Sequence, residues 1–181
     1  MDLDKAIKTR RSIRKFSKEK PDWRKIIEAI DATRYVPLAG KNFTMKFIVV
    51  SDKKKIEEIA NFCQQDFIKE VFYVVVACSN YSRLTNLFGE KGEVYGRQQA
   101  GAAIQNFLLK LNDLGLSTCW VGHFLEDSLK KLLKIPQEVT IEAIFPIGFS
   151  SEKKQKDKEK LRIELERILY FDEYGKETMK K

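Results

Sequence analysis

An uninterrupted apolar run near the middle of the chain constrains the fold more than any other feature. Residues 71–79 read VFYVVVACS and are almost all β-branched, aromatic or small and apolar. The run is far shorter than the roughly 20 residues that a membrane-spanning helix requires. It also lacks the alternation of polar and apolar residues that a strand with one solvated face shows. The pattern therefore predicts a central β-strand buried on both faces.

Apolar residues on either side of this run recur with helical or strand periodicity. After Pro21 and Asp22 they recur at intervals of three and four, which predicts a helix that begins there. Asp52 is placed as the N-cap of another amphipathic helix. Together these patterns predict an α+β fold. Further helices are expected over residues 2–9, about 98–114 and 126–133, and strands over 43–51, 118–124 and 139–148. Residues 81–92 are expected to form a loop, with a short helix as an alternative.

Composition excludes several classes of protein. The 181 residues are 43% hydrophobic and 33% charged, which excludes an intrinsically disordered chain, a collagen and a membrane span. A chain of this length can bury roughly 70% of its surface, so we expect one domain over residues 1–181. The first residues, MDLDK, include acids and no apolar core, so they do not form a signal peptide. We expect a cytoplasmic protein with no membrane partner.

Metal-dependent and nucleophilic chemistry have little support in the sequence. Cys63, Cys78 and Cys119 lie far apart without a CxxC spacing, and His123 is the only histidine. No metal site is therefore expected, nor a catalytic triad that is not built around His123. We expect the cysteines to be buried, reduced thiols. Catalysis would then depend on a bound cofactor.

The basic excess has three possible meanings. With 34 Lys and Arg against 26 Asp and Glu, the formal net charge is +8. Such an excess suits a nucleic-acid surface, a site for an anionic small molecule or a soluble Lys-rich surface. Much of it lies in residues 153–160, KKQKDKEK, where acids are interleaved and no nucleic-acid-binding motif accompanies the lysines. No nucleic-acid partner is therefore expected.

The sharpest local feature is RRSIR at residues 10–14. If this segment is extended, Arg10, Ser12 and Arg14 share one face while Ile13 points to the core. Two guanidiniums that flank a hydroxyl suit a phosphate, although such a cluster is also typical of an ordinary surface or a modification site. No GxGxxG or GxxxxGK[ST] occurs. A bound phosphate would therefore be held by side chains.

Five blocks in the right order and spacing resemble the flavin-dependent nitroreductase family. The blocks cover nearly the whole chain and read RRSIRKF, PLAGKNFTMKFIVV, GAAIQNFLLKLNDLGLSTCWVGHF, FPIGF and KLRIELERILYFDEYG. The resemblance implies a mixed, mostly antiparallel sheet flanked by helices, in an obligate homodimer with FMN at the subunit interface. About residues 163–181 would form a C-terminal arm that packs on the partner subunit. The implied reaction is ping-pong hydride transfer from NADH or NADPH through flavin N5 to a nitroaromatic, a quinone or a similar small acceptor.

The resemblance also assigns roles to individual residues. It places Arg10, Arg11 and Ser12 on the FMN phosphate and Arg14 beside N1–C2=O, where its charge tunes the flavin. No side chain is expected to act as a catalytic acid or base, because the flavin carries the redox chemistry. The remaining cofactor contacts that it implies are Pro37, Leu38, Ala39 and Lys41 from the second subunit, Gln64 or Gln65, the strand end Trp120, Val121, Gly122 and His123, and the late basic pair Lys160 and Arg162.

Several residues depart from the family pattern. The loop that usually reads close to PSAxNxQPW has Lys41 and Phe43 in place of Asn and Gln, and the common Gln-Asp before the long helix is Gln98-Gln99. These departures lie on the subunit-shared side of the expected flavin site. They leave the acceptor and the choice of NADH or NADPH open. The alternative function is a flavin-binding member with a sensory or regulatory role.

Overall fold

A computed structural model describes residues 1–152 and 163–179 of the chain. The chain divides into two compact units, Met1–Ser151 and Glu152–Lys181. The first contains the sheet and the α-helices, and the described part of the second contains one 3₁₀ turn, Leu165–Arg167. The expectations of a single domain and of an arm at about 163–181 stay predictions. No helix in the described ranges has both the length and the apolarity that a bilayer crossing needs.

The four strands form one sheet in the order β1-β2-β4-β3, and every neighbouring pair is antiparallel. This confirms the expected α+β fold with a mostly antiparallel sheet. The strands are β1 (Met45–Val50), β2 (Tyr73–Ser79), β3 (Ser117–Thr118) and β4 (Thr140–Gly148). The helices are α1 (Leu3–Thr9), α2 (Trp23–Asp31), α3 (Lys53–Cys63), α4 (Ser82–Phe88), α5 (Lys91–Asp113) and α6 (Glu126–Leu133).

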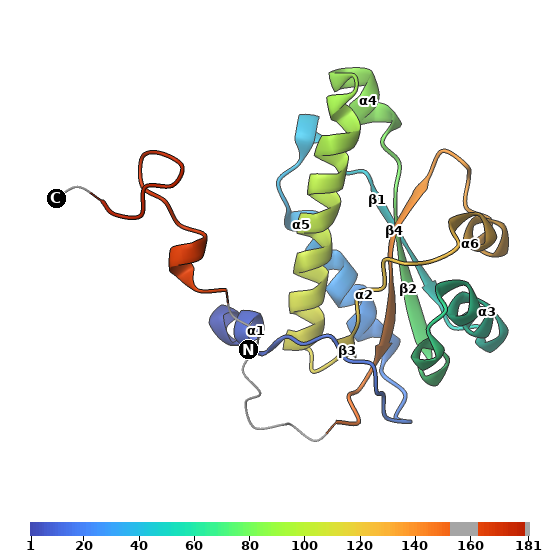
Figure 1. Ribbon diagram of the computed structural model, residues 1–181. Coiled ribbons are helices and arrows are strands. Elements are labelled where there is room, and N and C mark those ends of the chain that lie inside the picture. The colour runs from blue at the N-terminus through green and yellow to red at the C-terminus, as the bar shows by residue number, and fades with distance from the viewer. Residues whose placement is uncertain (153–162, 180–181) are drawn as a thin grey trace. The chain divides into compact units, whose positions relative to one another are not determined.

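Strand β2 is buried along its whole length, as the apolar run predicts. Alternate side chains enter two separate cores, because successive residues of a strand point to opposite faces. Val75 belongs to the core that α2 and α5 cover, whereas Val74 and Val76 belong to the core under α3 and α6. Figure 1 shows the sheet between these two helical layers.

Helices α4 and α5 approach each other at two glycines of α5. A Cβ atom on Gly92 would lie 2.4 Å from the backbone of Leu84, and one on Gly96 would lie 2.3 Å from the ring of Tyr81. Real side chains do not tolerate such distances. The glycines therefore permit a tight α4–α5 hairpin, and the expected loop over 81–92 is largely helical.

Other boundaries also differ from the expectation. Helix α5 begins at Lys91 instead of about residue 98. Strand β3 is Ser117–Thr118, so it contains only the first residue of the expected strand 118–124. Val121 forms an isolated bridge with Ile144 before the chain leaves the sheet. Within the small-residue stretch near the start of the expected helix, Ala100 and Ala103 are buried in this chain's own core.

Candidate functional site

Residues 10–14, called here the cationic segment, lie beside the edge strand β3. Ser12 forms a parallel bridge with Thr118, and the Ile13 N–H donates to the Thr118 carbonyl at 2.9 Å. Ile13 packs against the core under α3 and α6, as the alternation predicts. These contacts fix the backbone of the segment against Thr118, which lies two residues before Trp120 in the sequence.

Two guanidiniums of the cationic segment have no carboxylate partner. Within residues 1–152 and 163–179, neither Arg10 nor Arg14 forms an ion pair. Arg11 differs, because its Nη1 donates to the Lys8 carbonyl at 2.8 Å and to the Arg10 carbonyl at 3.0 Å. Arg11 thus binds the last turn of α1, while Arg10, Arg14 and the exposed Ser12 remain available to an anion.

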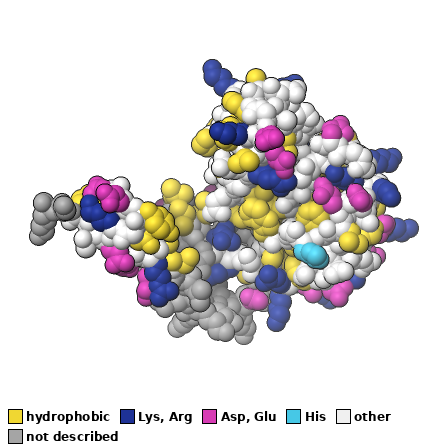
Figure 2. Space-filling model, turned by 45° about the horizontal axis from the view of Figure 1, so that its top comes forward, with side chains coloured by type: hydrophobic (Ala, Val, Ile, Leu, Met, Phe, Trp, Pro, Cys, Tyr) yellow, Lys and Arg dark blue, Asp and Glu magenta, His cyan; other side chains and the backbone are white. Residues whose placement is uncertain are grey.

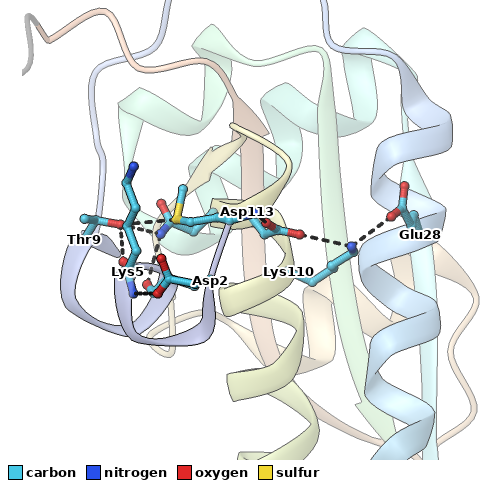
Figure 3. A network of polar contacts seen from close by, with 9 residues as sticks. Asp2, Lys5, Thr9, Glu28, Lys110 and Asp113 are labelled. Atoms are coloured by element: carbon cyan, nitrogen blue, oxygen red, sulfur yellow. Dashed lines mark hydrogen bonds and ion pairs between the residues drawn. The ribbon is translucent and has the colours of Figure 1, made fainter.

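The polar network in Figure 3 surrounds the C-terminal end of α5, close to the end of α1. Lys110 Nζ, near the C-terminal end of α5, lies 2.9 Å from Glu28 Oε1 of α2 and 3.1 Å from Asp113 Oδ2. Hydrogen bonds to both carboxylates raise the pKa of Lys110, and the bond to Glu28 has the larger effect. The Asn112 side chain donates to Thr9 Oγ1 at 2.9 Å, which ties the end of α1 to the same turn of α5.

A buried thiol and a buried hydroxyl lie directly beside the cationic segment. Thr118 Oγ1 has no hydrogen-bond partner in the described part of the chain. Burial raises the pKa of the Cys119 thiol, while the charge of Arg14 and the hydroxyl of Ser12 act in the opposite direction. Arg14 and Ser12 therefore lie close enough to affect the thiol of Cys119, which is itself buried.

Residues 120–123 continue from β3 and remain accessible on one side. The Trp120 ring is 42% exposed and lies 5.8 Å from the Phe145 ring. The Val121 N–H donates to the Ile144 carbonyl at 3.0 Å, so it is already engaged within the sheet. Among the described residues, the N–H groups of Gly122 and His123 have no protein acceptor. The histidine side chain lies at the surface (Figure 2).

Gln64 and Gln65 lie at the C-terminal end of α3, close to the same strand end. The Leu125 N–H donates to the Phe62 carbonyl at 3.0 Å, which joins the end of α3 to the chain after His123. Gln64 caps the helix in a left-handed conformation, with φ at 54°. Gln64 is exposed and Gln65 is half-buried. Both side chains can therefore serve a ligand at this end, and the structure does not select one of them.

Residues 37–44, called here the 37–44 loop, lie near the N-terminal half of α5. Pro37, Leu38 and Ala39 line a cavity of about 280 Å³ together with Tyr95, Gln98, Gln99 and Ala102. Helix α5 has 23 residues and is therefore about 34 Å long, and β3 follows its other end (Figure 1). Within one chain, the exposed Lys41 and the rest of the 37–44 loop do not join the cationic segment.

Some expected site residues fall outside what can be placed. Lys160 and Arg162 lie outside the described residues. The three cysteines are free and buried, as expected. No cluster of His, Cys, Asp and Glu in the described ranges could hold a metal ion.

Sequence reasoning missed the packing roles of Gly92 and Gly96, for which the Gly-x-x-x-Gly spacing was the available signal.

Comparison with known proteins shows the family of this chain. Residues 7–80 and 63–149 match the Nitroreductase family. A candidate NADH dehydrogenase/NAD(P)H nitroreductase of Methanothermobacter thermautotrophicus is 31% identical over 157 residues, which cover 84% of this chain and 79% of the relative.

Two solved structures share the fold. A nitroreductase family protein from Clostridium novyi NT is 28% identical, with a TM-score of 0.77 and coverage of 97% of this chain and 96% of that chain. An FMN-dependent nitroreductase from Clostridium difficile R20291 is 22% identical, with a TM-score of 0.79 and coverage of 95% and 100%. The sequence match and the shared fold agree with the resemblance stated from the five blocks. The chain belongs to the nitroreductase family.

Proposed function

We propose that this protein is an FMN-dependent NAD(P)H oxidoreductase that reduces small acceptors such as nitroaromatics or quinones. The observation that carries the proposal is the pair of guanidiniums, Arg10 and Arg14, which flank Ser12 and have no carboxylate partner among residues 1–152 and 163–179. Membership in the nitroreductase family and the name of the Methanothermobacter relative support it.

The groups at this end of α5 suit the parts of FMN. A phosphate dianion needs several charge-assisted donors, which Arg10, Ser12 and the predicted pair Lys160 and Arg162 would supply. Thr118 Oγ1 is a buried hydroxyl with no hydrogen-bond partner among the residues that the structure describes. The N–H groups of Gly122 and His123 could donate to polar atoms of the ring.

Bound flavin would supply the hydride chemistry, so the chain needs to bind and orient it. We assign to Arg14 a positive charge near N1–C2=O, where it favours the charge that reduction places on the ring. Trp120 offers an exposed aromatic surface to one side of the site. The ping-pong order, in which the nicotinamide leaves before the acceptor binds, is part of the proposal.

We also propose that the working protein is a homodimer. The 37–44 loop carries four predicted cofactor contacts but lies at the other end of α5 from the cationic segment. A second copy could bring its own 37–44 loop to the first copy's site. Apolar side chains of the C-terminal unit also remain exposed in the single chain: Ile163, Leu165, Ile168 and Leu169. Light scattering should give twice the chain mass, whereas a flavin-loaded monomer would contradict the dimer.

The visible absorbance spectrum of the purified protein tests the proposed activity. We expect flavin bands that bleach when NADH or NADPH is added without oxygen, and that return when a quinone or a nitrofuran follows. Bands that bleach with neither donor would favour the sensory or regulatory alternative. A colourless protein that does not take up added FMN would contradict both.

A further inference from the structure

We infer that Gln99 is a positioning residue that holds the 37–44 loop in the shape that the cofactor meets. The role of the loop rests on the proposed function, but the contacts of Gln99 do not. The side chain is 4% exposed on α5. Its Nε2 donates to the Asn42 carbonyl at 2.9 Å, and its Oε1 accepts from Thr44 N at 2.9 Å and from Thr44 Oγ1 at 3.0 Å.

These bonds require a group that donates on one side and accepts on the other. A carboxamide does both at once, whereas a carboxylate only accepts and an alkyl side chain does neither. Thr44 is also buried, so its N–H has no alternative partner in water. Gln99 thereby satisfies backbone groups of two loop residues with one side chain.

The loop conformation needs external support. Gly40 has φ at 53° and Lys41 has φ at 57°, so two consecutive residues are left-handed. A residue such as Lys41 adopts this region only where surrounding contacts impose it. The Asn42 side chain donates to the Gly40 carbonyl at 2.8 Å, and Gln99 in turn holds the Asn42 carbonyl.

Side chains of α4 pack close to the loop and limit the space around Gly40. A Cβ atom on Gly40 would lie 3.1 Å from Leu87 and 3.2 Å from Phe88. The loop therefore lies between the C-terminal end of α4 and the side of α5 that carries Gln99. Gln99 acts on the predicted cofactor contacts through the loop, with its amide oxygen and one of its N–H groups bonded to loop residues.

Gln99→Leu, compared with Gln105→Leu, tests the inference. Gln105 is an exposed residue of the same helix, so the control makes the same chemical change without touching the loop. In Gln99→Leu we expect trypsin to cleave after the exposed Lys41 about ten-fold faster than in the wild type. FMN affinity should fall by about the same factor, with both properties unchanged in the control.

Gln99→Glu adds a readout that a space-filling role would not produce. A protonated carboxyl can donate and accept like the amide, whereas the carboxylate cannot donate to the Asn42 carbonyl. Burial raises the pKa of such a carboxyl. Without that donation the loop should loosen at Asn42, whose own N–H donates to the Ala39 carbonyl. Hydrogen exchange at the Asn42 amide, relative to wild type at each pH, should therefore be normal in acid and faster as pH rises.

Each outcome has one meaning. Unchanged cleavage in Gln99→Leu, or pH-independent exchange in Gln99→Glu, would overturn the positioning role. If Gln99→Leu does not fold, the pH dependence of Gln99→Glu decides. A loosened loop with unchanged FMN affinity would overturn the link to the cofactor. A wild-type protein that binds no FMN would contradict the proposed function, while the cleavage result would still decide what Gln99 does.

Discussion

The cationic segment and the 37–44 loop lie near opposite ends of α5, and the chain satisfies their polar groups differently. Arg10 and Arg14 have no acid partner in the described residues, whereas Asn42 and Thr44 bond to the one buried side chain of Gln99. The first region is held by its backbone bond to β3, and of its three arginines only Arg11 forms a hydrogen bond through its side chain within the described residues. The second region is held through a side chain and has its backbone groups satisfied. The cationic segment should therefore respond to a ligand, while the shape of the loop should not depend on one.

The largest effect is expected from Arg10→Ala combined with Arg14→Ala. Each charge-assisted hydrogen bond contributes about 1.5–3 kcal/mol, so the Kd for FMN should rise about 100- to 10,000-fold. The free energy of unfolding without FMN should change by less than about 0.5 kcal/mol, because these side chains form no ion pair within the described part of the chain. Flavin titration and urea denaturation measure the two quantities.

A matched control for this double variant is Lys54→Ala, an exposed cation of α3. It should leave both the Kd and the stability at their wild-type values. FMN affinity that survives the loss of both guanidiniums would show that the cationic segment is an ordinary basic surface.

The next largest effect is expected where α4, which supports the 37–44 loop, packs against α5. In Gly96→Ala the new methyl group would enter the Tyr81 ring, and overpacking of this kind costs about 1–3 kcal/mol. The free energy of unfolding should fall by that amount in urea. Wild-type stability would mean that α4 moves aside without cost, and that the loop is not firmly supported from α4.

Gly101→Ala is the control for the glycine on α5. A Cβ atom there meets nothing within 4 Å, so replacing glycine inside a helix should stabilise the chain by about 0.5–1 kcal/mol. A loss instead of a gain would indicate that a second copy covers this position.

The α5 glycines Gly92 and Gly96 show what the sequence could and could not predict. The apolar run predicted β2, Asp22 and Asp52 cap α2 and α3 as expected, and α6 has the predicted bounds. Gly92 and Gly96 resembled loop residues because glycine disfavours helices. Their Gly-x-x-x-Gly spacing allows a close helix contact, but the position of α4 decides that the contact forms, so the true start of α5 could not be read from local propensity.

The same limit applies to the site. The alternation of residues 10–14 predicted that Ile13 packs on the core, because that depends on local geometry. It did not predict the exposure of Arg11, which alternation would place on the same face as Ile13. The bridge between Ser12 and Thr118 joins segments that are distant in the chain, and no local pattern encodes it. The role of Gln99 was hidden for the same reason, since the sequence showed only that it departs from the family's usual acid.

A smaller effect is expected in the reactivity of the thiols. Burial raises the pKa of Cys63 and Cys78 to about 12, so at pH 8 about one in ten thousand would be a thiolate. The pKa of Cys119 is also raised by burial, but Arg14 and Ser12 oppose the shift. In native protein without FMN, a disulfide reagent should label Cys119 before the other two, and FMN should slow that labelling. Equal rates at all three cysteines would contradict the placement of Arg14.

The smallest effect is expected where α2 is tied to the C-terminal end of α5. Glu28→Gln removes the charge that Lys110 meets at 2.9 Å, but the Glu28 side chain is 54% exposed, and surface ion pairs contribute about 0.2–1 kcal/mol. The free energy of unfolding should fall within that range at low salt, and the difference should shrink at high salt because the charges are screened. Glu57→Gln is the control, since its pair with Lys53 is longer, at 3.9 Å. FMN affinity should not change in either variant, because the backbone bond between Ile13 and Thr118 holds the cationic segment independently of this pair.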